Sequence, residues 1–125
     1  MIKDFDKKLQ KVLKCQKDFG HLVVHIKDKV PHAVYCGRGR SSKLYNPYSH
    51  KTGTMAKYVV GSREEAVVAF SDYLKKEIVA GRISPEKDLV PLAGRKLECF
   101  CSPLLCHCHV LAAAAAYYKK DLGKG

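Results

Sequence analysis

Long apolar runs are missing from this sequence. The longest uncharged apolar stretch, residues 110–118, has nine residues, whereas a membrane-spanning helix needs about 20. The first residues mix Lys and Asp and show none of the apolar region of a secretory signal. We therefore expect a cytoplasmic protein without a membrane partner. In that setting the six cysteines are expected to be reduced, and to serve as core residues, metal ligands or nucleophiles.

Tryptophan is absent too, but seven Tyr and four Phe supply aromatic bulk. The chain has 125 residues, of which 46% are hydrophobic, which suffices for one compact core. We expect a basic amphipathic helix over residues 1–20, a single α/β domain over 21–120 and a flexible tail over 121–125. Along the first helix, lysines recur on one side, which is also the pattern of an ordinary solvated face.

Acidic residues are missing between Lys29 and Arg63, in a chain whose formal charge is +11. Seven cations, counting those two, and four tyrosines occupy this stretch. Cations without nearby acids attract polyanions, and tyrosine rings can stack on bases. The pattern favours contact with phosphate or nucleic acid, while a solvated loop with cationic decoration is the alternative.

The apolar pattern predicts alternating strands and helices. Ser62 and Glu65 have the spacing of a capping box and so mark the start of a long helix. Residues 37–61 are expected to form a long ordered loop, with a short strand at 55–60. The other predicted elements are helices over 2–18 and 105–120, a short helix that begins at Ser84-Pro85-Glu86, and strands over 22–26, 33–36 and 96–101. This order predicts an α/β fold in which parallel crossovers are available.

Six of the eleven residues from 99 to 109 are Cys or His. Cys99 and Cys101 would share one face of a strand, and Cys106 and His107 would follow a short turn. Three thiolates and one imidazole can hold a tetrahedral zinc ion. His109 is a competing ligand, because it would share a helical face with Cys106. Cys15 and Cys36 are expected to lie outside this cluster.

Two other interpretations of the cluster remain open. Cys106 would stand at a helix N-terminus, which lowers a thiol pKa, and His107 could serve as its base. In that case Cys106 and His107 are catalytic residues. Reduced cysteines also pack as small hydrophobes, which needs no function at all.

The chain resembles a family of short phage and bacterial proteins, domain of unknown function 4326 (DUF4326). Members carry V-Y-x-G-R-P, then W-G-N-P-F, R-E-E-A and L-x-C-W-C-x-P-x-x-C-H-x-x-V-L. This sequence matches these motifs in order, at residues 34–38, 46–48, 63–66, 97–103 and 106–111. It departs from them at Gly39, at Leu44-Tyr45 and at Cys108-His109. The matched cysteines are Cys99, Cys101 and Cys106, and the matched imidazole is His107 rather than His109.

The resemblance implies a compact α/β fold in a phage or bacterial cytoplasm, and it supplies no reaction. By analogy, the sheet is expected to be small and Rossmann-like, flanked by helices, with an extra N-terminal helix. We expect a nucleotide or nucleic acid to be bound through a basic loop beside the Cys/His cluster. The alternative is a zinc-stabilised protein that binds DNA or a host protein without turnover. The candidate phosphate-binding residues are Gly37, Arg38, Gly39, Arg40, Asn46 and Tyr48.

Overall fold

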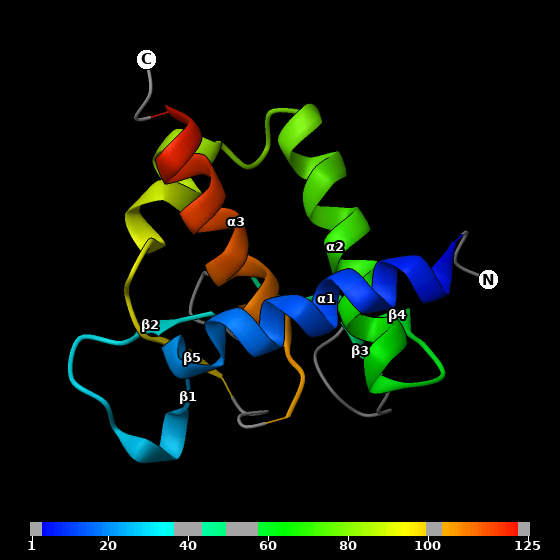
Figure 1. The fold of residues 1–125 in the computed structure, drawn as a ribbon, viewed down its shortest axis with the longest axis horizontal. Helices are drawn as coiled ribbons and strands as arrows, with labels where there is room; N and C mark the ends of the chain where they lie inside the picture. The colour runs from blue at the N-terminus through cyan, green and yellow to red at the C-terminus, as the bar shows by residue number, and fades with distance from the viewer. Residues whose placement is uncertain (1–3, 37–43, 50–57, 100–103, 123–125) are drawn as a thin grey trace.

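The computed structural model describes residues 4–36, 44–49, 58–99 and 104–122. The chain combines helices with short strands (Figure 1). The helices are α1 (Phe5–Phe19), α2 (Arg63–Val79) and α3 (His107–Leu122), and the strands are β1 (Val23–His25), β2 (Val34–Tyr35), β3 (Tyr48–Ser49), β4 (Tyr58–Val59) and β5 (Leu97–Cys99). Short helical turns cover Gly20–Leu22, Ile26–Asp28, Pro85–Leu89 and Val90–Leu92.

Three of the strands form a parallel sheet in the order β1-β5-β2. Strands β1 and β2 are consecutive in sequence, yet β5, from late in the chain, lies between them and pairs with both. All three strands therefore end at the same edge of the sheet. Strands β3 and β4 make a separate parallel pair. Helices combined with a small three-stranded parallel sheet are the coarse arrangement that the sequence predicts.

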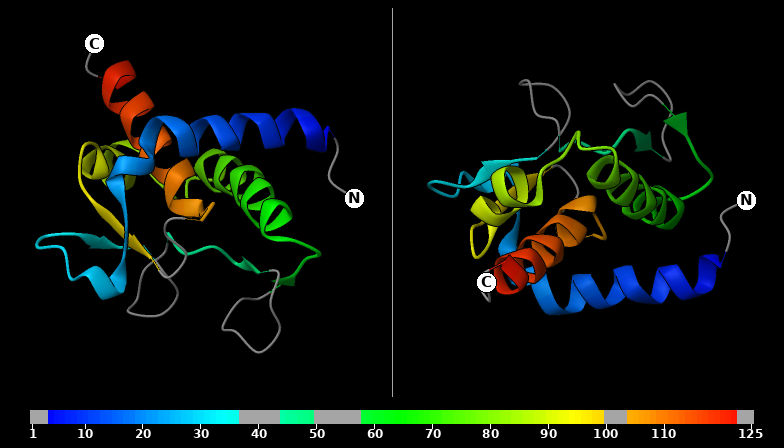
Figure 2. Two further views of the ribbon diagram at one scale, coloured as in Figure 1. Left: turned by 60° about the horizontal axis from the view of Figure 1, so that its bottom comes forward. Right: turned by 90° about the horizontal axis from the view of Figure 1, so that it is seen from above.

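Helix α1 forms the outer layer of the molecule. Helices α2 and α3 lie between α1 and the strands (Figure 2). Phe5, Leu9 and Leu13 pack on the core from one side of α1, and Val12 is buried there. Lys7, Lys11 and Lys14 are exposed, so α1 is amphipathic as expected.

Helix α2 begins where its cap predicts. The Ser62 hydroxyl accepts a hydrogen bond from the Glu65 backbone N–H at 3.0 Å. The Glu65 carboxylate in turn accepts from the Gly61 N–H at 3.3 Å, one residue earlier than the reciprocal bond of a standard capping box. Val67, Phe70 and Leu74 then face the core, because residues three and four apart share one side of a helix.

Helix α3 is the most deeply buried helix at its start. Every described residue from Leu105 to Ala112 is buried, and Leu97 of β5 and Leu111 of α3 are fully buried in the same core. The helix begins at His107, two residues after the predicted start, and continues to Leu122. Cys106 therefore precedes the helix instead of standing inside it, which decides where its thiol points.

The segment predicted as a long loop contains some regular structure. Strands β3 and β4 fall within it, and β4 overlaps the strand predicted at 55–60. Among the described residues, no helix is long and apolar enough to span a membrane.

Candidate functional site

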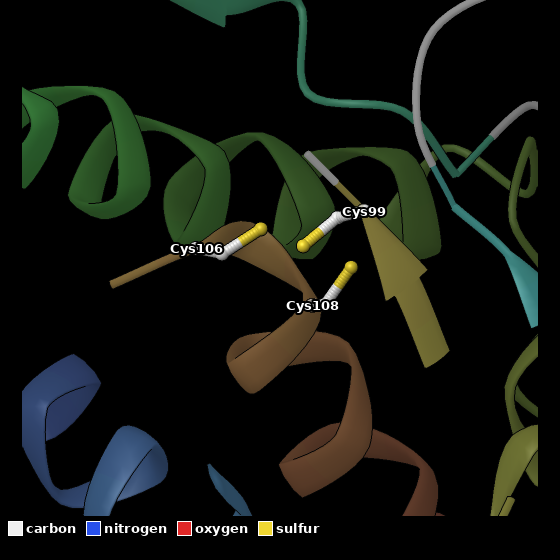
Figure 3. A group of neighbouring side chains, drawn as sticks. All are labelled: Cys99, Cys106 and Cys108. Carbon is white, nitrogen blue, oxygen red and sulfur yellow. The ribbon is translucent and has the colours of Figure 1, made fainter. Parts of the chain in front are cut away.

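Three buried cysteine thiols converge at the edge where the sheet ends. The Sγ atoms of Cys99, Cys106 and Cys108 all lie within 4.8 Å of one another. In Figure 3 the Cys99 thiol leaves the end of β5 toward the first turn of α3, from which Cys106 and Cys108 point back. Each of these residues is at most 2% exposed, so the cluster belongs to the interior of the protein.

Local geometry explains this convergence. Alternation along β5 places Leu97 and Cys99 on the buried face of the sheet. Two residues two apart on a helix point roughly 200° away from each other. Cys106, however, precedes the helix and is not bound to that periodicity, so its thiol can meet that of Cys108.

The structure describes only some of the predicted metal ligands. Cys99 and Cys106 are brought together, as the sequence predicts. Cys101 lies outside the described residues. Cys108 was missed as a candidate ligand, because the sequence suggested that Cys106 stands within the helix. The high density of Cys and His over residues 99–109 could have indicated Cys108 as a ligand.

His107 connects the cluster to the second strand. Its Nε2 lies 2.6 Å from the carbonyl oxygen of Cys36, and since a carbonyl only accepts, Nε2 carries the proton. Its Nδ1 lies 3.5 Å from the Cys106 Sγ. The ring of Phe70 packs edge-on against the imidazole at 5.0 Å between centroids. The imidazole is thereby held beside the Cys106 thiol.

The surroundings of His107 favour its charged form. Burial opposes the charge, but Cys106 and the Cys36 carbonyl outweigh it and raise the pKa of His107 to about 9. An imidazolium near neutral pH would stabilise a thiolate on Cys106. The same pair can therefore serve either a metal site or a nucleophile.

His109 contacts the backbone of Cys106. The Cys106 backbone N–H donates to His109 Nδ1 at 3.0 Å, as an acid at this position does in a capping box. Burial lowers the pKa of His109, which keeps the ring neutral and its Nδ1 able to accept. Of the two histidines, His107 is the one that meets the Cys106 thiol.

Cys36 was predicted to lie outside the cluster, and it is not among the three thiols that all lie within 4.8 Å of one another, although it adjoins them. Tyr35 pairs with Glu98 in the register of β2 and β5, so Cys36 follows opposite Cys99. The Cys36 N–H donates to the Glu98 carbonyl at 3.1 Å. A hydrogen bond with Cys108 lowers the pKa of Cys36, against the effect of burial. The position of Cys36 opposite Cys99 follows from the strand register, which cannot be read from the sequence.

The predicted phosphate-binding residues fall into two groups. Gly37, Arg38, Gly39 and Arg40 lie outside the described residues. Asn46 is described and buried, and its amide donates to the Ala66 carbonyl at 3.1 Å and accepts from the Tyr48 N–H at 2.9 Å. These contacts give Asn46 a role in holding its segment to α2, and Tyr48 lies in β3.

One cation near the cluster was not singled out as a site residue. Arg63, the first residue of α2, donates from Nη1 to the Leu105 carbonyl at 3.4 Å. Leu105 immediately precedes Cys106, so Arg63 fixes the entry to α3. The match of residues 63–66 to the R-E-E-A motif could have indicated Arg63 as a site residue.

Comparison with known proteins places the chain in a family. An uncharacterized 12.4 kDa protein from the nrdA-td intergenic region of Enterobacteria phage T4 is 32% identical over 97 residues, which cover 70% of this chain and 89% of that protein. No solved structure matches the chain significantly. The model of a domain of unknown function matches residues 23–117, a range that includes the cysteine cluster and excludes α1. The chain therefore belongs to the DUF4326 family.

Proposed function

We propose that the cluster binds one zinc-type metal ion through the thiolates of Cys99, Cys106 and Cys108. The observation that carries the proposal is the mutual approach of three buried sulfurs to within 4.8 Å. Zinc–sulfur bonds of about 2.3 Å around a tetrahedral ion hold sulfurs about 3.8 Å apart. Small side-chain rotations would reach that spacing. Sulfur donors also favour zinc over the hard cations that bind oxygen.

His107 and Cys101 are the predicted donors for the remaining position. Bonds of about 2.3 Å to sulfur and 2.0–2.1 Å to nitrogen imply a separation of about 3.5 Å between the two atoms on one zinc ion. His107 Nδ1 and Cys106 Sγ are 3.5 Å apart. The carbonyl that fixes Nε2 is the kind of partner that metal-binding imidazoles use.

Four protein ligands would make this a closed, structural site. The ion would tie β5 to α3 and add its binding free energy to the stability of the fold. This supports a zinc-stabilised protein that works through its surface. Reduced thiols are required, which a cytoplasmic setting would supply.

A second candidate function is the binding of a phosphate-bearing ligand, a nucleotide or nucleic acid, by the segment that starts at Gly37. It is favoured by the contact of His107 with Cys36, because Cys36 directly precedes Gly37 in the sequence. Strands β2 and β5 are parallel, and open α/β sheets bind ligands where such strands end. In this proposal the sheet serves as a small Rossmann-like platform, with Arg38 and Arg40 as phosphate contacts.

Elemental analysis of protein purified under reducing conditions tests the metal site. The parent should carry about one zinc per chain. A Cys99→Ser, Cys106→Ser double variant should lose it. Cys15→Ser, a control on α1, should keep it. A parent that takes up no zinc even when supplied with it would contradict the proposal and leave Cys106 as a nucleophile with His107 as its base, or as a packing residue.

A further inference from the structure

We infer that Cys36 is a further thiolate ligand of this centre, so that four sulfurs from three parts of the chain hold the ion. The inference rests on the proposed metal function and names a donor that stands at the variable position of the V-Y-x-G-R-P motif and outside the cluster at 99–109. The complete set is Cys36, Cys99, Cys106 and Cys108. His107 is then a positioning residue.

The strand register is the first observation. Val34 and Tyr35 pair with Leu97 and Glu98, which sets Cys36 beside Cys99 at the ends of two hydrogen-bonded parallel strands. Residues side by side in a parallel pair point to the same face of the sheet. Both are buried, with 0% of Cys36 and 2% of Cys99 exposed. The two residues therefore lie side by side on the buried face of the sheet, and Cys36 meets the start of α3 through His107.

Contact with Cys108 is the second observation. Interactions with the thiols of Cys106, Cys36 and Cys99 raise the pKa of the Cys108 thiol well above its ordinary value. Cys36 is not one of the three thiols that all lie within 4.8 Å of one another, so it adjoins that group through Cys108. Four thiols that reach one ion are a complete donor set for tetrahedral zinc.

His107 fixes how these parts meet. Nε2 holds the Cys36 carbonyl at 2.6 Å and Nδ1 faces the Cys106 Sγ at 3.5 Å. The imidazole therefore sets the end of β2 against the residue that precedes α3. With Phe70 packed on the ring, His107 positions two ligands without being one.

The Cys36 side chain must turn to reach the ion. As a thiol it donates to the Val34 carbonyl at 3.6 Å, a long and weak bond. Ligation removes the thiol proton to solvent and replaces that bond with a sulfur–metal bond. Rotation about a single side-chain torsion suffices to re-aim the sulfur.

Cadmium NMR of the cadmium-loaded protein tests the inference, because the cadmium chemical shift reports how many thiolates bind the ion. The parent should give a four-thiolate signal, and Cys101→Ser should leave it unchanged. Cys36→Ser should move it to the three-thiolate range. If Cys36→Ser fails to fold, the spectra of the parent and of Cys101→Ser still test the role of Cys36. A four-thiolate signal that persists in Cys101→Ser requires Cys36 as the fourth ligand.

The alternative outcomes separate the two proposals. A three-thiolate signal in the parent overturns the role of Cys36 and keeps the metal site. The same conclusion follows if the parent gives a four-thiolate signal that Cys101→Ser abolishes and Cys36→Ser leaves intact. Failure of the parent to bind cadmium or zinc overturns the proposed function itself.

Discussion

His107 Nε2 lies 2.6 Å from the carbonyl oxygen of Cys36, a residue 71 positions earlier in the chain. This buried contact joins the first residue of α3 to the end of β2. Because β2 pairs with β5, it also fixes the helix against the edge where Cys99 stands. The His107 imidazole therefore lies where the end of β2 meets the residue that precedes α3.

His107→Phe should destabilise the protein. Phenylalanine keeps an aromatic ring against Phe70 but leaves the buried Cys36 carbonyl without its partner, which costs about 1–3 kcal/mol. Urea unfolding of chelator-treated parent and variant measures the difference. Equal midpoints would mean that the contact contributes nothing to stability.

The stability contributed by His107 should depend on pH. Its pKa of about 9 in the folded protein lies above the ordinary value of 6.5, so the folded state binds the proton more tightly. That contribution is complete below about pH 6.5 and is lost as the pH rises to about 9. In chelator-treated protein, the difference in unfolding free energy between the parent and His107→Phe should shrink across this window. A difference that grows with pH would contradict the raised pKa.

His109→Ala should weaken the start of α3 by about 1 kcal/mol, because the Cys106 N–H loses its acceptor. Metal content should stay at the parent level. His109→Gln, which can also reach back to that N–H, should lose less stability in thermal unfolding. Loss of metal in both variants would instead make His109 a ligand.

Arg38→Ala should weaken binding of a polyphosphate far more than Lys11→Ala. Lys11 is an exposed residue of α1 and a better control than Lys8, which is paired with Asp72 at 3.0 Å. Equal effects in a titration would exclude a specific site.

Nucleic acid affinity, where present, should fall steeply as salt rises, because a cationic surface binds by counterion release. Binding to a labelled oligonucleotide at low and high salt measures this. An affinity that salt does not change would contradict an electrostatic contact.

Much of the fold could be predicted from local patterns. The cap at Ser62 located the start of α2, and the apolar stripe located its buried side. Strands β1, β2, β4 and β5 were predicted within a few residues of their observed bounds, and the part of the predicted Lys96–Cys101 strand beyond Cys99 lies outside the described residues. Strand β3 was not predicted, because Tyr48–Ser49 lies in the segment expected to form a loop. What local patterns could not supply is the order β1-β5-β2, since pairing depends on contacts distant in sequence.

The candidate site, like the fold, could be predicted only where local sequence patterns determine it. The density of Cys and His identified Cys99 and Cys106 correctly as neighbours. Cys108 was missed through a two-residue error in where α3 begins. Cys36 was missed because only the register of β2 on β5 brings it beside Cys99. The family resemblance favoured His107 over His109, and in the structure it is His107 whose Nδ1 lies 3.5 Å from the Cys106 Sγ.

X-ray absorption at the zinc edge of the zinc-loaded protein tests the central claim most directly. The account predicts a first shell dominated by sulfur at about 2.3 Å. A shell made only of nitrogen and oxygen at about 2.0–2.2 Å would contradict it, because the ion would then be bound away from Cys99, Cys106 and Cys108.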